Sequence, residues 1–161
     1  QNIFPATGFI HALWSVRRFE ARTEIFDFRV SAPLVVPAVA KSVTFVVRQT
    51  GVYCELWDVA GKVCYAQGRV QEATSTSRPL AEMKKLDCQG IESKFYYPHI
   101  RRLGYEYGNS YQLLENITWR TACLPNVPAD WISYMDACLH MKMLDESSLA
   151  YPVGFNRVVL W

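Results

Sequence analysis

Apolar residues recur at helical spacing near the start of the chain. Pro5 suits a first helical turn, and Phe9, Leu13 and Val16 follow at intervals of three or four residues. The pattern predicts a helix over residues 5–19.

From residue 24 to residue 70 the pattern changes to β-branched and aromatic stretches. Residues 42–47 and 52–57 are two such stretches, and Gly51 and the pair 60–61 interrupt the run. These features predict several antiparallel strands after one helix. Residues 71–92 then carry Ser, Thr, Pro, Lys and Glu with few large apolar groups, which is typical of a surface linker.

The chain beyond this stretch begins again with a predicted helix. Residues 92–103 predict a short helix, residues 104–108 a turn, and residues 111–119 a strand. Asp130 is suited to cap the start of a second helix over residues 131–144. Four residues at three-and-four spacing predict its buried face: Trp131, Met135, Cys138 and Leu139.

A last predicted strand, residues 157–161, closes the chain. Each half is then one long helix with antiparallel strands around it, which predicts a duplicated α+β unit. The expected boundaries are 1–72 for the first half, 73–92 for the linker and 93–161 for the second half.

Composition and charge exclude several classes of protein. The 17 basic and 15 acidic residues are mixed along the chain, and the net charge of +2 gives no basic stripe for a nucleic acid. No apolar run approaches the roughly 18 residues of a membrane span. The five cysteines are odd in number, form no CxxC pair and lack metal-ligand spacing. We therefore expect reduced thiols, no metal and a cytoplasmic location.

Asp136 and His140 stand four residues apart on the second predicted long helix. They share a helix face and can meet by a hydrogen bond. If the pair is buried, the carboxyl group of Asp136 would hold a proton near neutral pH, as a general acid requires. The alternative, commoner for a pair at this spacing, is a polar face turned to solvent. Both readings stay open from the residues alone.

Two glycine-containing segments are further candidates. Residues 104–108, Gly-Tyr-Glu-Tyr-Gly, allow a tight turn that directs a tyrosine hydroxyl into a cavity, or form a plain aromatic turn. Residues 4–8 place small residues at a helix entry, where free amides can receive a thioester carbonyl, or are an ordinary helix start. His11 and His99 have no nucleophile nearby, and we assign them no role.

Taken together, Phe4–Phe9, Gly104–Gly108 and Trp131–Met141 resemble, in order and approximate spacing, the dehydratase region of animal-type fatty acid synthases and of related reducing polyketide synthases. The resemblance is weak through the middle strands. It implies a double hot-dog, in which two long helices are each wrapped by an antiparallel sheet, with the active site between the halves.

The resemblance also implies roles for particular residues. The family dehydrates a (3R)-3-hydroxyacyl thioester to a trans-2-enoyl thioester, and Asp136 matches the acid that protonates the departing hydroxyl. His140 matches the glutamine or histidine that holds this acid in place. Tyr107 matches the tyrosine that lines the site, and the pair Tyr151-Pro152 matches an element that follows the second helix and walls the acyl tunnel. The residues that would bind substrate are Tyr107, Gly108, Pro5, Gly8 and Pro152.

Two positions depart from the family pattern. The family's catalytic histidine belongs to an HxxxGxxxxP motif whose proline matches Pro5, so the resemblance places that histidine before Gln1. We expect a chain that lacks strands at both ends; a derived domain without its base is the other reading. Asn109 stands where the family usually has proline.

The resemblance further implies substrates carried on the phosphopantetheine of an acyl carrier domain, no bound cofactor, neighbouring synthase domains and a homodimeric parent enzyme. Two other functions stay open. One is a catalytically silent hot-dog that binds acyl groups or supports a dimer, and the other is a thioesterase of the same fold in which the carboxylate of Asp136 activates water.

Overall fold

The computed structural model describes residues 3–37, 39–40, 42–74, 90–118, 122, 124, 130–140, 143 and 151–160. The chain divides into two compact units. The first unit is Gln1–Pro79 together with Pro152–Trp161, and the second is Leu80–Tyr151.

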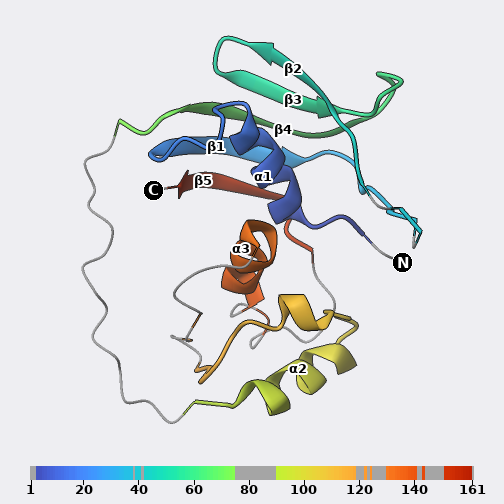
Figure 1. The fold of residues 1–161 in the computed structure, drawn as a ribbon, viewed down its shortest axis with the longest axis vertical. Helices are drawn as coiled ribbons and strands as arrows, with labels where there is room; N and C mark the ends of the chain where they lie inside the picture. The colour runs from blue at the N-terminus through green and yellow to red at the C-terminus, as the bar shows by residue number, and fades with distance from the viewer. Residues whose placement is uncertain are drawn as a thin grey trace. The chain divides into compact units, whose positions relative to one another are not determined.

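The first unit contains a five-stranded antiparallel sheet (Figure 1). The order of its strands is β2-β3-β4-β1-β5. Their bounds are Thr23–Val30 for β1, Val46–Thr50 for β2, Tyr53–Trp57 for β3, Cys64–Glu72 for β4 and Gly154–Leu160 for β5. The predicted antiparallel strands between residues 24 and 70 are confirmed, although residues 42–45 precede β2 instead of belonging to it.

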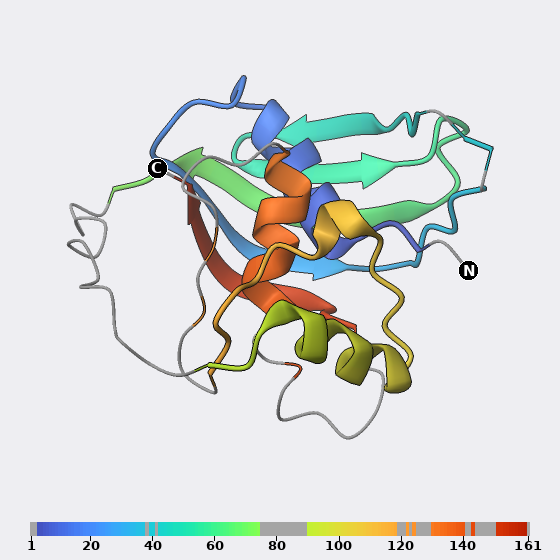
Figure 2. The ribbon, with the colours of Figure 1, turned by 60° about the horizontal axis from the view of Figure 1, so that its bottom comes forward.

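Helix α1, Ala6–Ser15, lies along one face of this sheet (Figures 1 and 2). Its Phe9 and Leu13 are 1% and 0% exposed, because they form the apolar core between helix and sheet. Helix and sheet lie in direct contact at Gly68 of β4, where a Cβ atom would lie 3.4 Å from Leu13 Cδ1, an ordinary van der Waals distance. The first unit is therefore one helix against an antiparallel sheet, as a hot-dog half requires.

Helix α1 ends earlier than its apolar pattern predicts. Arg18 and Phe19 adopt left-handed backbone conformations, with φ angles of 53° and 59°. A helix cannot continue through such residues. The indole of Trp14 instead donates to the carbonyl oxygen of Glu20 at 2.9 Å, which closes the turn after the helix.

Strand β5 belongs to the first unit, although it is close to the end of the chain. It pairs with β1 from Thr23 opposite Leu160 to Arg29 opposite Gly154. The guanidinium of Arg157 donates to the carboxylate of Glu24, which is buried on β1. The division therefore differs from the expected second half of 93–161, because backbone pairing takes residues 152–161 into the first unit. The expected linker, 73–92, lies mostly outside the described residues.

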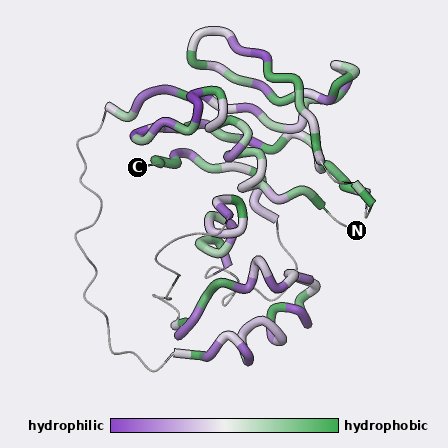
Figure 3. Tube along the Cα trace, viewed as in Figure 1, coloured by the Kyte–Doolittle hydropathy of each residue, from purple (hydrophilic) through white to green (hydrophobic). Residues whose placement is uncertain are grey.

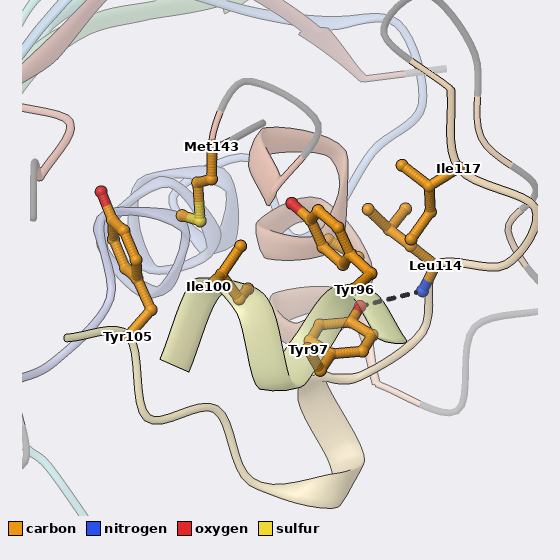
Figure 4. Close-up of a cluster of buried hydrophobic side chains, with 8 residues drawn as sticks. Tyr96, Tyr97, Ile100, Tyr105, Leu114, Ile117 and Met143 are labelled. Carbon is orange, nitrogen blue, oxygen red and sulfur yellow. Dashed lines mark hydrogen bonds between the residues drawn. The ribbon is translucent and has the colours of Figure 1, made fainter. Parts of the chain in front are cut away.

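The described residues of the second unit include three short helical elements. They are α2 (Ser93–Arg102), the 3₁₀ turn η1 (Asn109–Tyr111) and α3 (Trp131–His140). Hydrophobic residues interrupt the hydrophilic ones along α2 (Figure 3), and the inner face of this helix contributes to the core of the unit. That core is a cluster of buried side chains (Figure 4): Tyr96, Tyr97, Ile100, Tyr105, Leu114, Ile117, Ala137 and Met143.

The helices of this unit follow the sequence, but the predicted strand over residues 111–119 is wrong. Its described residues hold the last residue of η1 and isolated bridge positions at Glu115 and Ile117, where Ile117 pairs with Ile91. Two local features prevent a longer ladder. The amide of Leu114 donates to the hydroxyl of Tyr97 at 3.0 Å instead of to a strand, and Asn116 has a left-handed φ of 48°.

Candidate active site

Helix α3 begins at the predicted cap. The carboxylate of Asp130 accepts hydrogen bonds from the amides of Ile132 at 3.2 Å and Ser133 at 2.8 Å. These bonds satisfy two of the amides that a helix leaves without partners at its first turn. The cap therefore sets where α3 starts and how its faces are directed.

The residues that α3 buries are Ser133, Asp136, Ala137 and His140, and this corrects the predicted buried face. Ser133, Asp136 and His140 are 3%, 6% and 0% exposed, at the three-and-four spacing of one helix face. Trp131 is 43% exposed and Cys138 is also exposed. The alternative of a solvent-facing polar pair is wrong as well. Tertiary packing therefore buries the polar side chains of α3 inside the second unit.

Asp136 and His140 are in contact. The Nε2 atom of His140 lies 3.2 Å from Oδ2 of Asp136, and the two side chains are 0% and 9% exposed. A buried carboxyl group is costly unless a partner bonds to it, so the imidazole supports the presence of Asp136 inside the unit.

Three tyrosines surround His140. The hydroxyl of Tyr97 lies 3.4 Å from Nδ1, on the opposite side of the imidazole from Asp136. The ring of Tyr107 packs on the imidazole with 4.0 Å between ring centroids. The hydroxyl of Tyr96 donates to the backbone carbonyl oxygen of His140. The imidazole is therefore held by contacts on its ring, at both nitrogens and at its backbone.

These tyrosines keep their protons over the ordinary pH range. Burial raises the pKa of Tyr107 far above 10, and the negative charge of Asp136 raises it further. Burial also raises the pKa of Tyr97, while the amide of Leu114 acts in the opposite direction. Each hydroxyl is thus available as a hydrogen-bond donor; that of Tyr107 donates to Sδ of Met143 at 3.8 Å.

The turn at residues 104–108 follows α2 directly. Gly104 has a φ of 102°, which favours glycine, and its amide donates to the carbonyl of Arg101 at 3.0 Å. After it, the rings of Tyr105 and Tyr107 lie almost parallel, with centroids 6.1 Å apart. The side-chain amide of Gln112 donates to the carbonyl of Tyr107 at 2.8 Å. The turn therefore positions Tyr107 against His140 of α3.

A pocket of about 450 Å³ opens between α2 and this turn. Its lining is Tyr97, Pro98, Arg101, Tyr105, Glu106, Tyr107, Gly108, Asn109 and Gln112. Asp136 and His140 do not line it. Tyr97 and Tyr107, however, both line the pocket and contact His140, so two hydroxyl-bearing rings join the pocket to the buried pair.

The remaining predicted residues belong to the first unit. Pro5 precedes α1 with extended backbone, and the amide of Gly8 donates to the carbonyl of Pro5 at 3.0 Å. Because of this bond, the amide of Gly8 already has a partner. The ring of Phe4 lies directly against Gly8, where a Cβ atom would be 2.5 Å from Cε1. Pro152 lies two residues before β5.

Tyr97 is the residue that sequence reasoning missed. The signal was present, because Tyr96, Tyr97 and Ile100 form the apolar stripe of the predicted helix. A stripe of this kind is usually core, and only the contacts with His140 distinguish Tyr97. His99 is exposed, and His11 packs against the ring of Phe19.

Other kinds of site are missing from the described part of the chain. No three His, Cys, Asp or Glu residues gather there as a metal site would require. None of the described helices has the length and apolar character needed to cross a membrane. The described cysteines, Cys54, Cys64 and Cys138, are free thiols.

No protein-family model matches this chain, and no curated protein matches it in sequence. Solved structures do match it. The dehydratase domain from the CurF module of curacin polyketide synthase has a TM-score of 0.68 at 22% identity, covering 96% of this chain and 67% of that one. An isomerase-inactive variant of GphF DH1 has a TM-score of 0.70 at 19% identity, covering 96% and 64%.

The CurK dehydratase also matches, as two inactive mutants. In one a histidine is replaced by phenylalanine (TM-score 0.68, 18% identity, 96% and 66% coverage), and in the other an aspartate is replaced by asparagine (0.67, 15%, 96% and 66%). The chain thus has the α+β hot-dog fold of polyketide synthase dehydratase domains. It spans about two thirds of their length, from 64% to 67%.

Proposed function

We propose that this chain forms part of the dehydratase domain of a polyketide synthase or a related fatty acid synthase. Its reaction would be the dehydration of a (3R)-3-hydroxyacyl thioester to a trans-2-enoyl thioester. The observation that carries the proposal is the buried contact between Asp136 and His140 on α3, in a chain with the fold of such domains.

Asp136 is the general acid in this proposal. The elimination breaks the C2–H and C3–O bonds and forms the C2=C3 double bond. Asp136 gives its carboxyl proton to the departing hydroxyl, which leaves as water, and becomes a carboxylate. Nε2–H of His140 then donates to Oδ2, and a hydrogen bond to a charged acceptor is stronger than one to a neutral acceptor. His140 thus stabilises the acid in the form it takes after the proton has left.

The base that removes the C2 proton is the histidine that the family resemblance places before Gln1. The inactive CurK mutants, one at a histidine and one at an aspartate, support a mechanism with two such residues. Neither His11 nor His99 suits this task. His11 packs among aromatic rings, and His99 is exposed on α2.

Tyr107 and Gly108 are the proposed substrate-binding residues of the second unit. They line the pocket beside the acid pair, and the protonated Tyr107 can donate to an acyl group. The family resemblance also implies that Pro5, Gly8 and Pro152 contact the acyl chain. An acyl carrier domain would deliver the chain on its phosphopantetheine arm, within a cytoplasmic homodimeric synthase, and no cofactor takes part.

The decisive variant is Asp136→Asn in a domain that includes the sequence upstream of Gln1. Dehydration of a 3-hydroxyacyl pantetheine thioester, followed by mass spectrometry, should fall about 10²- to 10⁴-fold because the proton donor is lost. Cys138→Ser is the matched control, since it changes an exposed residue of the same helix. Full turnover by folded Asp136→Asn would exclude Asp136 as the acid.

The products decide between this proposal and its alternatives. A silent hot-dog would bind the thioester in the tyrosine-lined pocket and return it unchanged, whereas a thioesterase would release the free 3-hydroxy acid. Only dehydration gives the 2-enoyl thioester, so one chromatographic comparison of the three species separates the hypotheses.

A further inference from the structure

We propose that Tyr97 is a positioning residue that fixes the tautomer of His140. Its hydroxyl proton is directed to Nδ1, which holds the imidazole proton on Nε2, where it faces Asp136. The catalytic consequence of this inference depends on the proposed function, but the tautomer itself does not.

The hydroxyl oxygen of Tyr97 is fixed by several neighbours. It accepts a hydrogen bond from the amide of Leu114 at 3.0 Å (Figure 4), which occupies an oxygen lone pair. Its own proton has two acceptors within reach, Nδ1 of His140 at 3.4 Å and the carbonyl oxygen of Tyr111 at 3.5 Å. Tyr97 is 5% exposed, so water cannot freely replace these partners.

The phenol acts toward Nδ1 as a donor. Burial raises the pKa of Tyr97, which keeps the proton on its oxygen. A neutral imidazole carries a hydrogen on one nitrogen only. If Nδ1 accepts from Tyr97, the hydrogen is on Nε2, 3.2 Å from Oδ2 of Asp136. The direction of both hydrogen bonds of His140 is then set by one phenol.

The other tautomer would work against proton transfer to substrate. With hydrogen on Nδ1, the bare Nε2 would be an acceptor 3.2 Å from Oδ2 and would accept the carboxyl proton of Asp136. That proton would be held between two protein groups instead of being directed to the leaving hydroxyl. After transfer, the new carboxylate would also face a lone pair.

The alternative hypothesis, that Tyr97 is only a core residue, predicts a different result for the same variant. If Tyr97 only filled space, Tyr97→Phe would keep its ring, its edge contact with Tyr96 and the tautomer of His140. Removal of the hydroxyl alone therefore separates packing from positioning. Tyr134→Phe, on the half-buried side of α3, is the matched control for loss of a hydroxyl.

The direct test is nitrogen-15 NMR of the imidazoles in the complete domain, with His140 assigned by its loss in His140→Gln. We expect hydrogen on Nε2 in the wild type and a mixture of tautomers in Tyr97→Phe. Hydrogen on Nδ1 in the wild type would overturn the proposal without any need for the variant to fold. An unchanged tautomer in folded Tyr97→Phe would overturn it as well.

Kinetics supply the second test. Tyr97→Phe should lower kcat about fivefold, the equivalent of one hydrogen bond, with KM little changed. A glutamine amide has fixed donor and acceptor atoms, so Tyr97→Phe should lose most of this effect in the His140→Gln background. Equal effects in both backgrounds would contradict a tautomer role.

The two proposals fail separately. If the wild type gives no enoyl product but Tyr97→Phe changes the tautomer, the dehydratase proposal fails and the positioning of His140 stands. If dehydration requires Asp136 but the tautomer is insensitive to Tyr97, the dehydratase proposal stands and this inference fails.

Discussion

Helices α1 and α3 have ten residues each, but most of the side chains that α1 buries are apolar, whereas most of those that α3 buries are polar. Helix α1 buries Phe9, Leu13 and other apolar groups against a sheet, whereas α3 buries Ser133, Asp136 and His140. The apolar face stabilises its unit by removing hydrocarbon from water. The polar face has to bond every group that it buries. The difference is that α1 contributes mainly hydrophobic packing, whereas α3 holds a carboxyl group and an imidazole inside its unit.

The largest expected effect comes from a pair of matched leucines. Leu13→Ala in α1 should lower the free energy of unfolding by about 2–5 kcal/mol, because it opens a cavity at a fully buried position. Leu139→Ala in α3 should cost far less, about 1 kcal/mol or below, since Leu139 is only half-buried. Urea titration measures both. Equal losses would mean that α3 buries its apolar side after all.

A somewhat smaller effect is expected when the polar face loses one partner. His140→Leu should destabilise the second unit by about 1–3 kcal/mol, because Asp136 and the hydroxyl of Tyr97 lose a bonding partner inside the unit. Adding Asp136→Leu should recover part of this loss, because the double variant no longer buries a carboxyl group that has lost its partner. Urea titration of the single and double variants tests this, and a double variant less stable than His140→Leu would contradict it.

The smallest expected effect is a change in how stability depends on pH, and it develops only in alkaline solution. The pKa of Tyr107 is raised above 10 by burial and by Asp136, so between pH 10 and that higher value the folded protein binds more protons than the unfolded chain. Its contribution to stability is complete below pH 10 and is lost as the pH rises. Tyr107→Phe should therefore lose stability less steeply above pH 10 than the wild type.

Urea titrations at pH 7 and at several alkaline values measure this slope, and Tyr134→Phe is the control because Tyr134 has no such burial. Identical slopes for the wild type and Tyr107→Phe would show that the phenol ionises as easily in the folded protein as in the unfolded chain.

Local sequence patterns predicted the helices and strands better than they predicted which elements pack or pair with each other. The caps and apolar spacings gave α1, α2 and α3, and Asp130 caps α3 as expected. The strand over residues 111–119 failed because the amide of Leu114 bonds to a tyrosine hydroxyl, a contact between residues 17 positions apart. A run of β-forming residues does not reveal whether a neighbouring strand is available.

The candidate site shows the same limit. The four-residue spacing and the family resemblance identified Asp136 and His140, and the Gly-Tyr-Glu-Tyr-Gly segment identified Tyr107. Spacing also predicted the wrong buried face for α3, because Trp131 and Cys138 are more hydrophobic than Asp136 and His140. Tyr97 was missed because its ring alone suits a core.

The sequence by itself determined where helices start, which half of the chain is rich in strands, and which residues share a helix face, since these depend on nearby residues and backbone geometry. Only the tertiary structure decided that β5 pairs with β1, that the polar face of α3 is buried, and that Tyr97 reaches Nδ1 of His140. Two of those outcomes depend on distant residues, because β5 pairs with a strand near the other end of the chain and Tyr97 lies 43 residues before His140. Hydrogen bonds among the buried polar groups offset the cost of their burial.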